Sequence, residues 1–218
     1  MDYAHFDTSA GERQTATAQF NRVKLSDKIQ RLRESAFVRS IPTADDETLQ
    51  FLITQLRALQ PENILELGTA TGISGIAMLE VCPNATLTTI EKNTRFFEEA
   101  KDNFKCFGVN MRVNAINADA GEAIDMLSGT YDFIFMDCAK VQYIKYLPKL
   151  KKLLARGGVL IADDVLLFGW TTGEAEVPKK RKMLAKHICE YVDAVTHDDE
   201  LSTTILNIGD GLALSVKL

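Results

Sequence analysis

Residues 64–75 read ILELGTATGISG, an apolar run that breaks into small residues and glycines before it turns apolar again. The apolar start predicts a buried strand, and the apolar end predicts a helix. Glycine weakens regular structure, so a turn bounded by Gly68 and Gly72 indicates that some group must approach the backbone closely. One acidic residue, Glu66, stands just before this turn.

The chain from residue 63 onward repeats this alternation of short apolar runs and helical patterns. The predicted strands are NILEL (63–67), TLTTIE (86–91), MRVNAIN (111–117), YDFIFMD (131–137) and GVLIADD (158–164). The predicted helices are ISGIAMLEVC (73–82), NTRFFEEAKDNFKCFG (93–108), AGEAIDML (120–127) and VQYIKYLPKLKKLLARGG (141–158). Such alternation predicts βαβ units, in which helices cover both faces of a parallel sheet.

The C-terminal segment STTILNIGDGLALSVKL (202–218) has a different pattern. Two strand-like runs are joined by Gly-Asp-Gly, which predicts a hairpin of antiparallel strands. Together with the five parallel strands, this predicts a three-layer α/β fold with a mostly parallel seven-stranded sheet that ends in an antiparallel hairpin.

Two helices are expected before the first strand. Residues 21–36 have an amphipathic pattern, and TADDETLQFLITQLRAL (43–59) has a stronger one, with Thr43 as the expected cap. No repeat or linker divides the chain, so we expect one domain over residues 1–218, with residues 1–42 as an N-terminal arm and helix.

Composition excludes several protein classes. The chain has 218 residues, 46% hydrophobic and 25% charged, which fits a globular domain. Its net charge of −5 argues against nonspecific nucleic-acid binding by the whole surface. The four cysteines are widely spaced, which predicts free thiols rather than a disulfide framework. With no signal peptide and no membrane span in the sequence, we expect a cytoplasmic protein.

The glycine turn and the next strand predict a nucleotide-like ligand. In open α/β sheets, ligands bind beyond the carboxyl ends of the strands, and Glu91 at the end of the second strand is placed to accept ribose hydroxyls. The spacing G-x-x-x-G after Glu66 differs from the pyrophosphate motif of a nicotinamide dehydrogenase and suits the ammonium of S-adenosylmethionine. The alternative is that Gly68 and Gly72 form only a tight turn.

Acidic residues end the fourth and fifth predicted strands. Asp137 follows one, while Asp163 and Asp164 end the other. If these strands are neighbours, their carboxylates converge, and an oxygen-only cluster suits Mg²⁺, with Mn²⁺ or Ca²⁺ as alternatives. Lys140, three residues after Asp137, is a candidate base, because a nearby dication lowers the pKa of an ammonium group. The alternatives are solvated or capping acids and a lysine that only pairs with them.

At these residues the sequence resembles the catechol O-methyltransferase-like family of class I S-adenosylmethionine-dependent methyltransferases. The resemblance runs from about Pro42 to the C-terminus through ELGTATGIS, TIEKN, DFIFMDCAKVQY and GGVLIADDVLLFG. It implies a Rossmann-like methyltransferase fold. It also implies that the cofactor is bound by Glu66, Gly68, Ser74, Glu91, Asp119 and Asp137, the metal by Asp137, Asp163 and Asp164, and that Lys140 is the catalytic base. The family usually has Asn at position 164 and Ala at position 138.

The implied reaction is metal-dependent methyl transfer to a hydroxyl oxygen, and two acceptors stay open. The segments DCAKVQYIKYL and NIGDGLALSVK, with the basic run that contains Lys179, Lys182 and Lys186, resemble a bacterial subgroup that methylates 5-hydroxyuridine in tRNA. We place tRNA ahead of a small catechol. Residues 165–178 are expected to form a lid, or else a packed surface loop. The resemblance also implies a homodimer. A non-catalytic S-adenosylmethionine-binding protein is the alternative from another class.

Overall fold

A computed structural model describes residues 18–21 and 23–218. Most of the expected N-terminal arm lies outside the described residues. The helices are α1 (Asp27–Val38), α2 (Asp46–Leu59), α3 (Ile73–Val81), α4 (Thr94–Cys106), α5 (Ala120–Met126), α6 (Tyr143–Leu153) and α7 (Lys182–Thr196). The strands are β1 (Asn63–Leu67), β2 (Thr86–Glu91), β3 (Val113–Asn117), β4 (Tyr131–Met136), β5 (Leu154–Ala162), β6 (Leu201–Leu206) and β7 (Leu212–Lys217).

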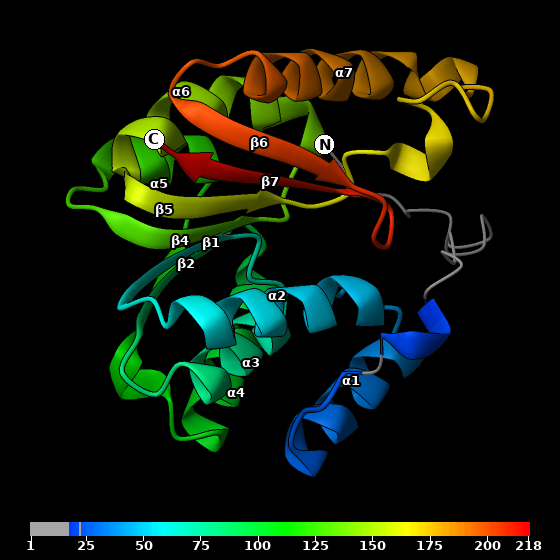
Figure 1. Cartoon of the computed structure of the whole chain (residues 1–218). Helices are drawn as coiled ribbons and strands as arrows, with labels where there is room; N and C mark the ends of the chain where they lie inside the picture. The colour runs from blue at the N-terminus through cyan, green and yellow to red at the C-terminus, as the bar shows by residue number, and fades with distance from the viewer. Residues whose placement is uncertain (1–17, 22) are drawn as a thin grey trace.

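The strands that the structure describes form one seven-stranded sheet in the order β3-β2-β1-β4-β5-β7-β6 (Figure 1). Strands β1 to β5 run parallel, while β7 is antiparallel to both β5 and β6. The predicted fold class, with its terminal hairpin, is confirmed. The order reverses beside β1, which is where ligands bind in sheets of this kind.

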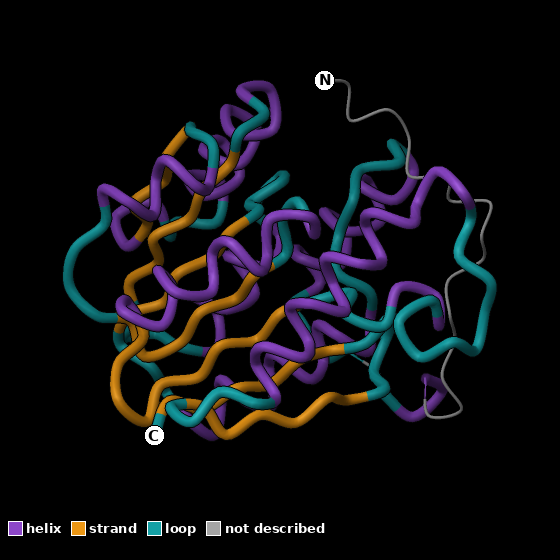
Figure 2. Tube along the Cα trace, turned by 90° about the horizontal axis from the view of Figure 1, so that it is seen from above, coloured by secondary structure: helices purple, strands orange, loops and turns teal. Residues whose placement is uncertain are grey.

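Helices cover both faces of the sheet, and each layer has its own apolar core. Helices α1 to α4 contribute to one cluster with the side chains on one face of the strands, such as Ile64 and Phe133. Helices α5 to α7 pack on the other face, against Leu65 and Ile134. The tube view shows the same layers from above (Figure 2). Among the described residues, none of the helices is long and apolar enough to cross a membrane.

Several predicted boundaries were wrong near the ends of elements. Helix α1 begins at Asp27 rather than residue 21, with Ser26 in extended conformation before it. Helix α2 is capped by Asp45 and not by Thr43, because the Asp45 side chain accepts a hydrogen bond from the backbone N–H of Thr48 at 2.8 Å. Strand β5 begins at Leu154, where we expected helix, because Leu154 pairs with Tyr131 before an irregularity in the register.

Candidate active site

The expected site residues gather at the carboxyl end of the parallel strands. Strands β4 and β5 are neighbours, and their pairing ends at Met136 and Ala162. The next residues are therefore Asp137 and Asp163, and the N–H of Asp163 donates to the carbonyl of Met136 at 3.0 Å. The expected convergence of the two strand ends is what the structure shows.

The glycine turn after β1 packs closely against the rest of the protein at two positions. Gly68 has φ +102°, and a Cβ atom there would lie 1.9 Å from the carbonyl oxygen of Asp137. Gly72 has φ +84°, and its Cβ would meet the ring of Phe104 at 2.9 Å. These protein contacts by themselves require glycine at both positions, and the close approach of a ligand to the turn stays a prediction. The turn needs glycine because its own neighbours approach closely.

Glu66 lies at the end of β1 and is completely buried. Its carboxylate accepts hydrogen bonds from Ser74 Oγ at 2.5 Å and Thr89 Oγ1 at 2.6 Å. Burial raises the pKa of Glu66 to about 7, although both hydroxyls oppose the rise. A carboxylate held this way gains from a cation at its side, which is the chemistry of an ammonium site.

Glu91 ends β2, and Asp119 lies just after the end of β3. Glu91 accepts from the backbone N–H of Ala70 at 2.9 Å, so it is attached to the glycine turn. Burial raises its pKa. Asp119 caps α5 and forms an ion pair with Lys92 at 2.9 Å, which lowers its pKa. Glu66, Ser74 and Glu91 are thus connected around the turn, while the Asp119 side chain contacts Lys92 and the start of α5.

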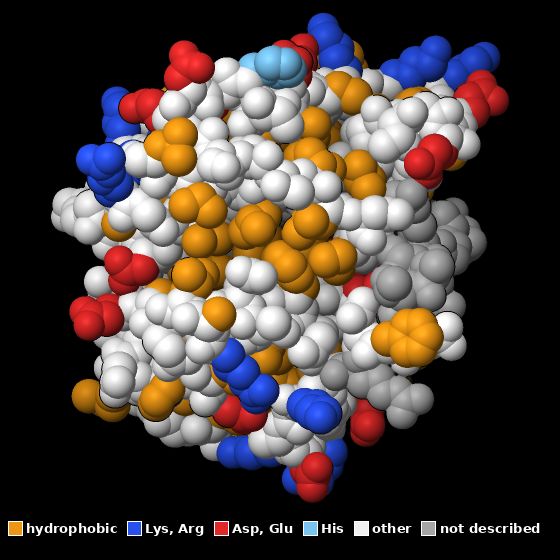
Figure 3. Space-filling view, in the orientation of Figure 1, with side chains coloured by type: hydrophobic (Ala, Val, Ile, Leu, Met, Phe, Trp, Pro, Cys, Tyr) orange, Lys and Arg blue, Asp and Glu red, His pale blue; other side chains and the backbone are white. Residues whose placement is uncertain are grey.

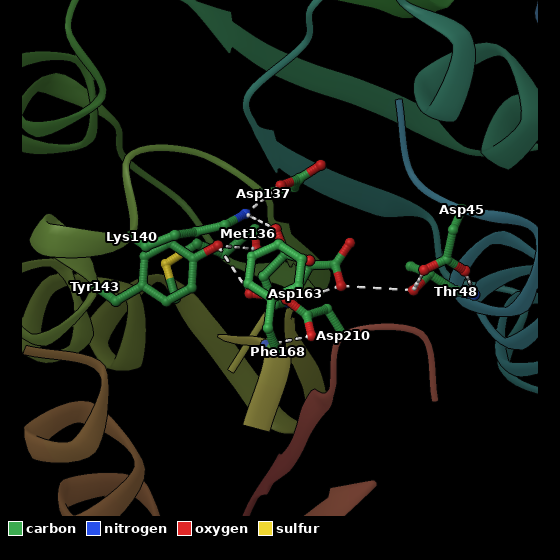
Figure 4. A network of polar contacts seen from close by, with 10 residues as sticks. Asp45, Thr48, Met136, Asp137, Lys140, Tyr143, Asp163, Phe168 and Asp210 are labelled. Atoms are coloured by element: carbon green, nitrogen blue, oxygen red, sulfur yellow. Dashed lines mark hydrogen bonds and ion pairs between the residues drawn. The ribbon is translucent and has the colours of Figure 1, made fainter. Parts of the chain in front are cut away.

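Lys140 is the residue that joins the acids (Figure 4). It is only 7% exposed, and its Nζ lies 2.5 Å from Asp137 Oδ1 and 2.9 Å from Asp164 Oδ2. Burial alone lowers the pKa of Lys140, but the charges of Asp137 and Asp164 outweigh it and raise the pKa well above its usual value. In this arrangement Lys140 is an ammonium ion that neutralises the acids.

The acidic cluster is larger than the sequence predicted. Asp163 is 4% exposed, and burial together with the nearby acids Asp164 and Asp137 raises its pKa well above the usual range. Thr48 Oγ1 lies 3.5 Å from Asp163 Oδ1, and it lies at the same distance from a carboxylate oxygen of Asp45. The Asp45 carboxylate also raises the pKa of Asp163.

Asp45 and Thr48 are therefore site residues that we missed. Asp45 is the N-cap of α2 and Thr48 lies in its first turn, across the site from the strand ends (Figure 4). An aspartate immediately before a helical pattern is a helix-capping signal, and it marks Asp45 in the sequence. It does not reveal that this cap faces the ends of β4 and β5.

The donor chemistry of this cluster fits a hard divalent cation. The site offers carboxylate oxygens and the Thr48 hydroxyl, and its acids outnumber the single ammonium of Lys140. As the side chains stand, no three His, Cys, Asp or Glu groups among the described residues are arranged to hold a metal ion. The space between Asp137 and Asp164 is taken by the Lys140 amine.

The segment after β5 carries two aromatic rings that pack together. Phe168 and Trp170 have ring centroids 5.3 Å apart at an interplanar angle of 56°. Phe168 has a left-handed backbone with φ +57°, and its N–H donates to Asp210 Oδ1 at 2.6 Å. The Gly-Asp-Gly loop of the terminal hairpin thereby fixes this segment, and Figure 4 shows the Phe168 side chain on the same side as Asp163.

The basic run lies farther along the chain and spans two elements. Lys179 belongs to a short 3₁₀ turn (Lys179–Arg181), and only Lys182 and Lys186 lie on α7. Arg181 ends the 3₁₀ turn directly before α7, so the three lysines do not lie on one continuous α-helix. All three are exposed, and Lys186 lies 3.7 Å from Glu190. Basic and acidic side chains are mixed on this part of the surface (Figure 3).

Comparison with known proteins gives consistent results. The family model for O-methyltransferases matches residues 19–218. Tapetum-specific methyltransferase 1 from Arabidopsis thaliana is 31% identical over 179 residues, which are 79% of this chain and 76% of that protein. Caffeoyl-CoA O-methyltransferase from Citrus natsudaidai is 28% identical over 185 residues, 81% of this chain and 79% of that one.

Solved structures agree. A Staphylococcus aureus protein, provisionally described as a caffeoyl-CoA O-methyltransferase, has 33% identity and a TM-score of 0.81, covering 89% of this chain and 93% of its own. The SAH-bound methyltransferase PaMTH1 from Podospora anserina has 21% identity and a TM-score of 0.84, covering 100% and 99% of the two chains. At that identity the second likeness supports the fold alone.

Proposed function

This chain belongs to the O-methyltransferase family and is an S-adenosylmethionine-dependent enzyme, and from that premise we propose that it methylates one of two adjacent oxygens on an aromatic small molecule with the help of a divalent cation. One observation carries the proposal. The cofactor turn at Gly68 and the acidic cluster around Lys140 meet at Asp137, so a methyl donor and an oxygen acceptor bound there would lie side by side.

The cofactor is proposed to lie over the glycine turn. Glu66, buried below the turn, would hold the amino group, and Gly68 and Ser74 flank the same place. Glu91, attached to Ala70, would accept the ribose hydroxyls. A hollow lined by Gly68, Ser74 and Asp137, together with residues 42–44, opens beside the turn. Asp119 is the proposed contact for the adenine end.

A divalent cation would be held by Asp137, Asp163 and Asp164, whose oxygens suit Mg²⁺ or Mn²⁺. Bound there, it would make the acceptor hydroxyl more acidic and orient it. Lys140 would take the hydroxyl proton at Nζ. To do so it must first lose its own proton, which Asp137 and Asp164 now hold in place. The positive charge of a bound cation would oppose the effect of these two carboxylates and favour the neutral form of the Lys140 amine.

Two features favour a small aromatic acceptor. Phe168 and Trp170 pack together in the segment that directly follows the acids at the end of β5, and aromatic side chains commonly line the pockets of flat apolar ligands. Relatives of this chain are named as methyltransferases of caffeoyl-CoA and of flavonoids, which are small molecules. Two adjacent oxygens, as in a catechol, would give such an acceptor two atoms for the cation.

A second candidate acceptor is tRNA that carries 5-hydroxyuridine. The exposed lysines at positions 179, 182 and 186 favour it, because phosphate contacts supply much of the affinity of RNA-binding proteins. Glu190, which lies 3.7 Å from Lys186, weakens the case. Homodimer formation and a cytoplasmic location stay predictions.

One experiment tests the proposal. The protein is incubated with labelled S-adenosylmethionine and Mg²⁺, together with either a panel of catechols or hydroxyuridine-bearing tRNA. We expect label in a catechol, loss of turnover with EDTA, recovery with Mg²⁺ or Mn²⁺, and no effect of reversing the charges of Lys179, Lys182 and Lys186. Label in tRNA that disappears on those reversals would favour the second candidate. Full turnover in EDTA would refute the metal site, and cofactor binding without any transfer would refute catalysis.

A further inference from the structure

Tyr143 is a buried residue that the proposed reaction does not use. It is the first residue of α6, it follows Lys140 by three positions, and its side chain is fully buried. Its hydroxyl lies 2.9 Å from the carbonyl oxygen of Met136 and 3.2 Å from that of Asp163, so one O–H proton is shared between two carbonyls (Figure 4).

One carbonyl belongs to the residue before a proposed metal ligand, and the other belongs to a proposed ligand itself, Asp163. Met136 precedes Asp137, and Asp163 precedes Asp164. Regular pairing of β4 with β5 stops at Met136 and Ala162, and one further backbone bond follows, from the N–H of Asp163 to the carbonyl of Met136. The Tyr143 hydroxyl therefore continues the connection between the strands at the point where their ladder ends.

The ring of Tyr143 contributes a second contact. Lys140 Nζ lies 5.6 Å from the ring centroid, within the range of a cation–π interaction. On another side, Tyr191 packs edge-on, with centroids 5.4 Å apart and an interplanar angle of 72°. The ring is thus held by Tyr191 while it contacts the ammonium group, and its hydroxyl is aimed at the strand ends.

We propose that Tyr143 is a positioning residue of the methyl-transfer site. Its hydroxyl sets the spacing between the backbones that carry Asp137 and the Asp163–Asp164 pair, and its ring supports Lys140. This inference rests on the proposed function. Groups that orient metal ligands through a hydrogen bond typically change metal affinity or activity by about 10–100-fold when removed. A tyrosine that only filled the core would change stability and leave both unaffected.

The structure offers a matched control. Tyr191 is as completely buried as Tyr143, and it lies against the same ring, but its hydroxyl has no hydrogen-bond partner among the described residues. Tyr143→Phe and Tyr191→Phe therefore remove the same atom from neighbouring buried rings. Only the first change removes a contact to the strand ends.

Three quantities are measured for both variants: Mn²⁺ binding by calorimetry, S-adenosylmethionine binding, and kcat with the acceptor that the labelling experiment identifies. We expect Tyr143→Phe to weaken Mn²⁺ binding and to lower kcat, each by about 10-fold or more, with cofactor affinity within about 2-fold of wild type. We expect Tyr191→Phe to leave all three unchanged. Thermal unfolding of both variants shows whether each is folded at the assay temperature.

The outcomes separate this inference from the proposed function. If the wild-type protein binds Mn²⁺ and Tyr143→Phe matches it in affinity and kcat, the positioning role is overturned while the metal proposal stands. Equal losses in both variants would show general damage to the core and would also overturn it. If the wild-type protein methylates its acceptor but binds no Mn²⁺, the metal proposal fails. In that case a kcat for Tyr143→Phe equal to that of Tyr191→Phe overturns the inference, and a selective loss supports it.

Discussion

Glu66 predicts a pH dependence of cofactor binding that is measurable. Its pKa without ligand is raised to about 7, since burial disfavours the charged form. A cofactor ammonium placed at Glu66 requires the ionised carboxylate. Below pH 7 the carboxyl is protonated in the free protein, so binding must first remove that proton, and affinity falls as the pH falls.

The size of the effect follows from the pKa. Each pH unit below the pKa costs about 1.4 kcal/mol, so at pH 5.5 the penalty is about 2 kcal/mol, or roughly a 30-fold weaker affinity than at pH 7.5. Glu66→Gln cannot ionise, and its affinity should be nearly constant over this range. At pH 7.5 it should bind more weakly than wild type by about 1.5–3 kcal/mol, because a hydrogen bond to a charged group is lost.

Calorimetry at pH 5.5, 6.5 and 7.5, in buffers of different ionisation enthalpy, measures both the affinity and the protons released on binding. Glu62→Gln is a suitable control, because Glu62 is exposed and lies just before the same strand. Wild type and Glu62→Gln should release close to one proton at pH 5.5, and Glu66→Gln close to none. An identical pH dependence in Glu66→Gln would refute the placement of the ammonium at Glu66.

Three further predictions concern the turn and the cluster. Lys140→Met should lower kcat by about 10²–10⁴-fold and leave cofactor binding nearly unchanged. A variant with the kcat of wild type would show that Lys140 is not the catalytic base. Asp164→Asn should leave the stability nearly unchanged, because asparagine also tolerates the φ of +57° at this position, and its metal affinity should stay within about 10-fold of wild type. Loss of metal binding would show that the Asp164 carboxylate has a specific role. Gly68→Ala should lower the free energy of unfolding by about 3 kcal/mol or more in denaturant titrations. Gly129 has φ +87° and no atom within 4 Å of an added Cβ, so Gly129→Ala should lower it by only about 1–2 kcal/mol. Equal losses of stability in the two variants would argue against the contact between Gly68 and Asp137.

The fold was predictable because its signals are local and repeat along the chain. Apolar runs such as residues 63–67 and 131–136 end in acids or glycines, and each is followed by a helical pattern. Parallel strands with covering helices are the fold class typical of that alternation, and the Gly-Asp-Gly hairpin added the antiparallel end. The residues after β4 and β5 were predicted to meet because strand ends of one sheet lie at one edge.

What the sequence did not reveal depends on contacts between distant segments. Asp45 caps α2 by a local rule, but its place near Asp163 follows from how α2 packs across the sheet end. Gly68 is required by the carbonyl of Asp137, which no pattern within residues 64–75 contains. The raised pKa of Lys140 likewise depends on carboxylates that come from two strand ends.

Asp137 connects both halves of the proposed reaction. Its N–H donates to the carbonyl of Leu67 at 2.9 Å, and its own carbonyl fills the space where Gly68 lacks a side chain. Its carboxylate contacts Lys140. The cofactor turn and the acidic cluster are therefore built on one residue, so neither can shift without the other. In-line methyl transfer from a sulfonium to an oxygen is sensitive to the placement of the two reacting atoms, and a misplacement of about 1 Å can lower the rate by about 10²-fold. A shared backbone at this position is a direct way for the fold to keep donor and acceptor aligned. For this reason we expect a change as small as one methyl group at Gly68 to affect both proposed binding sites.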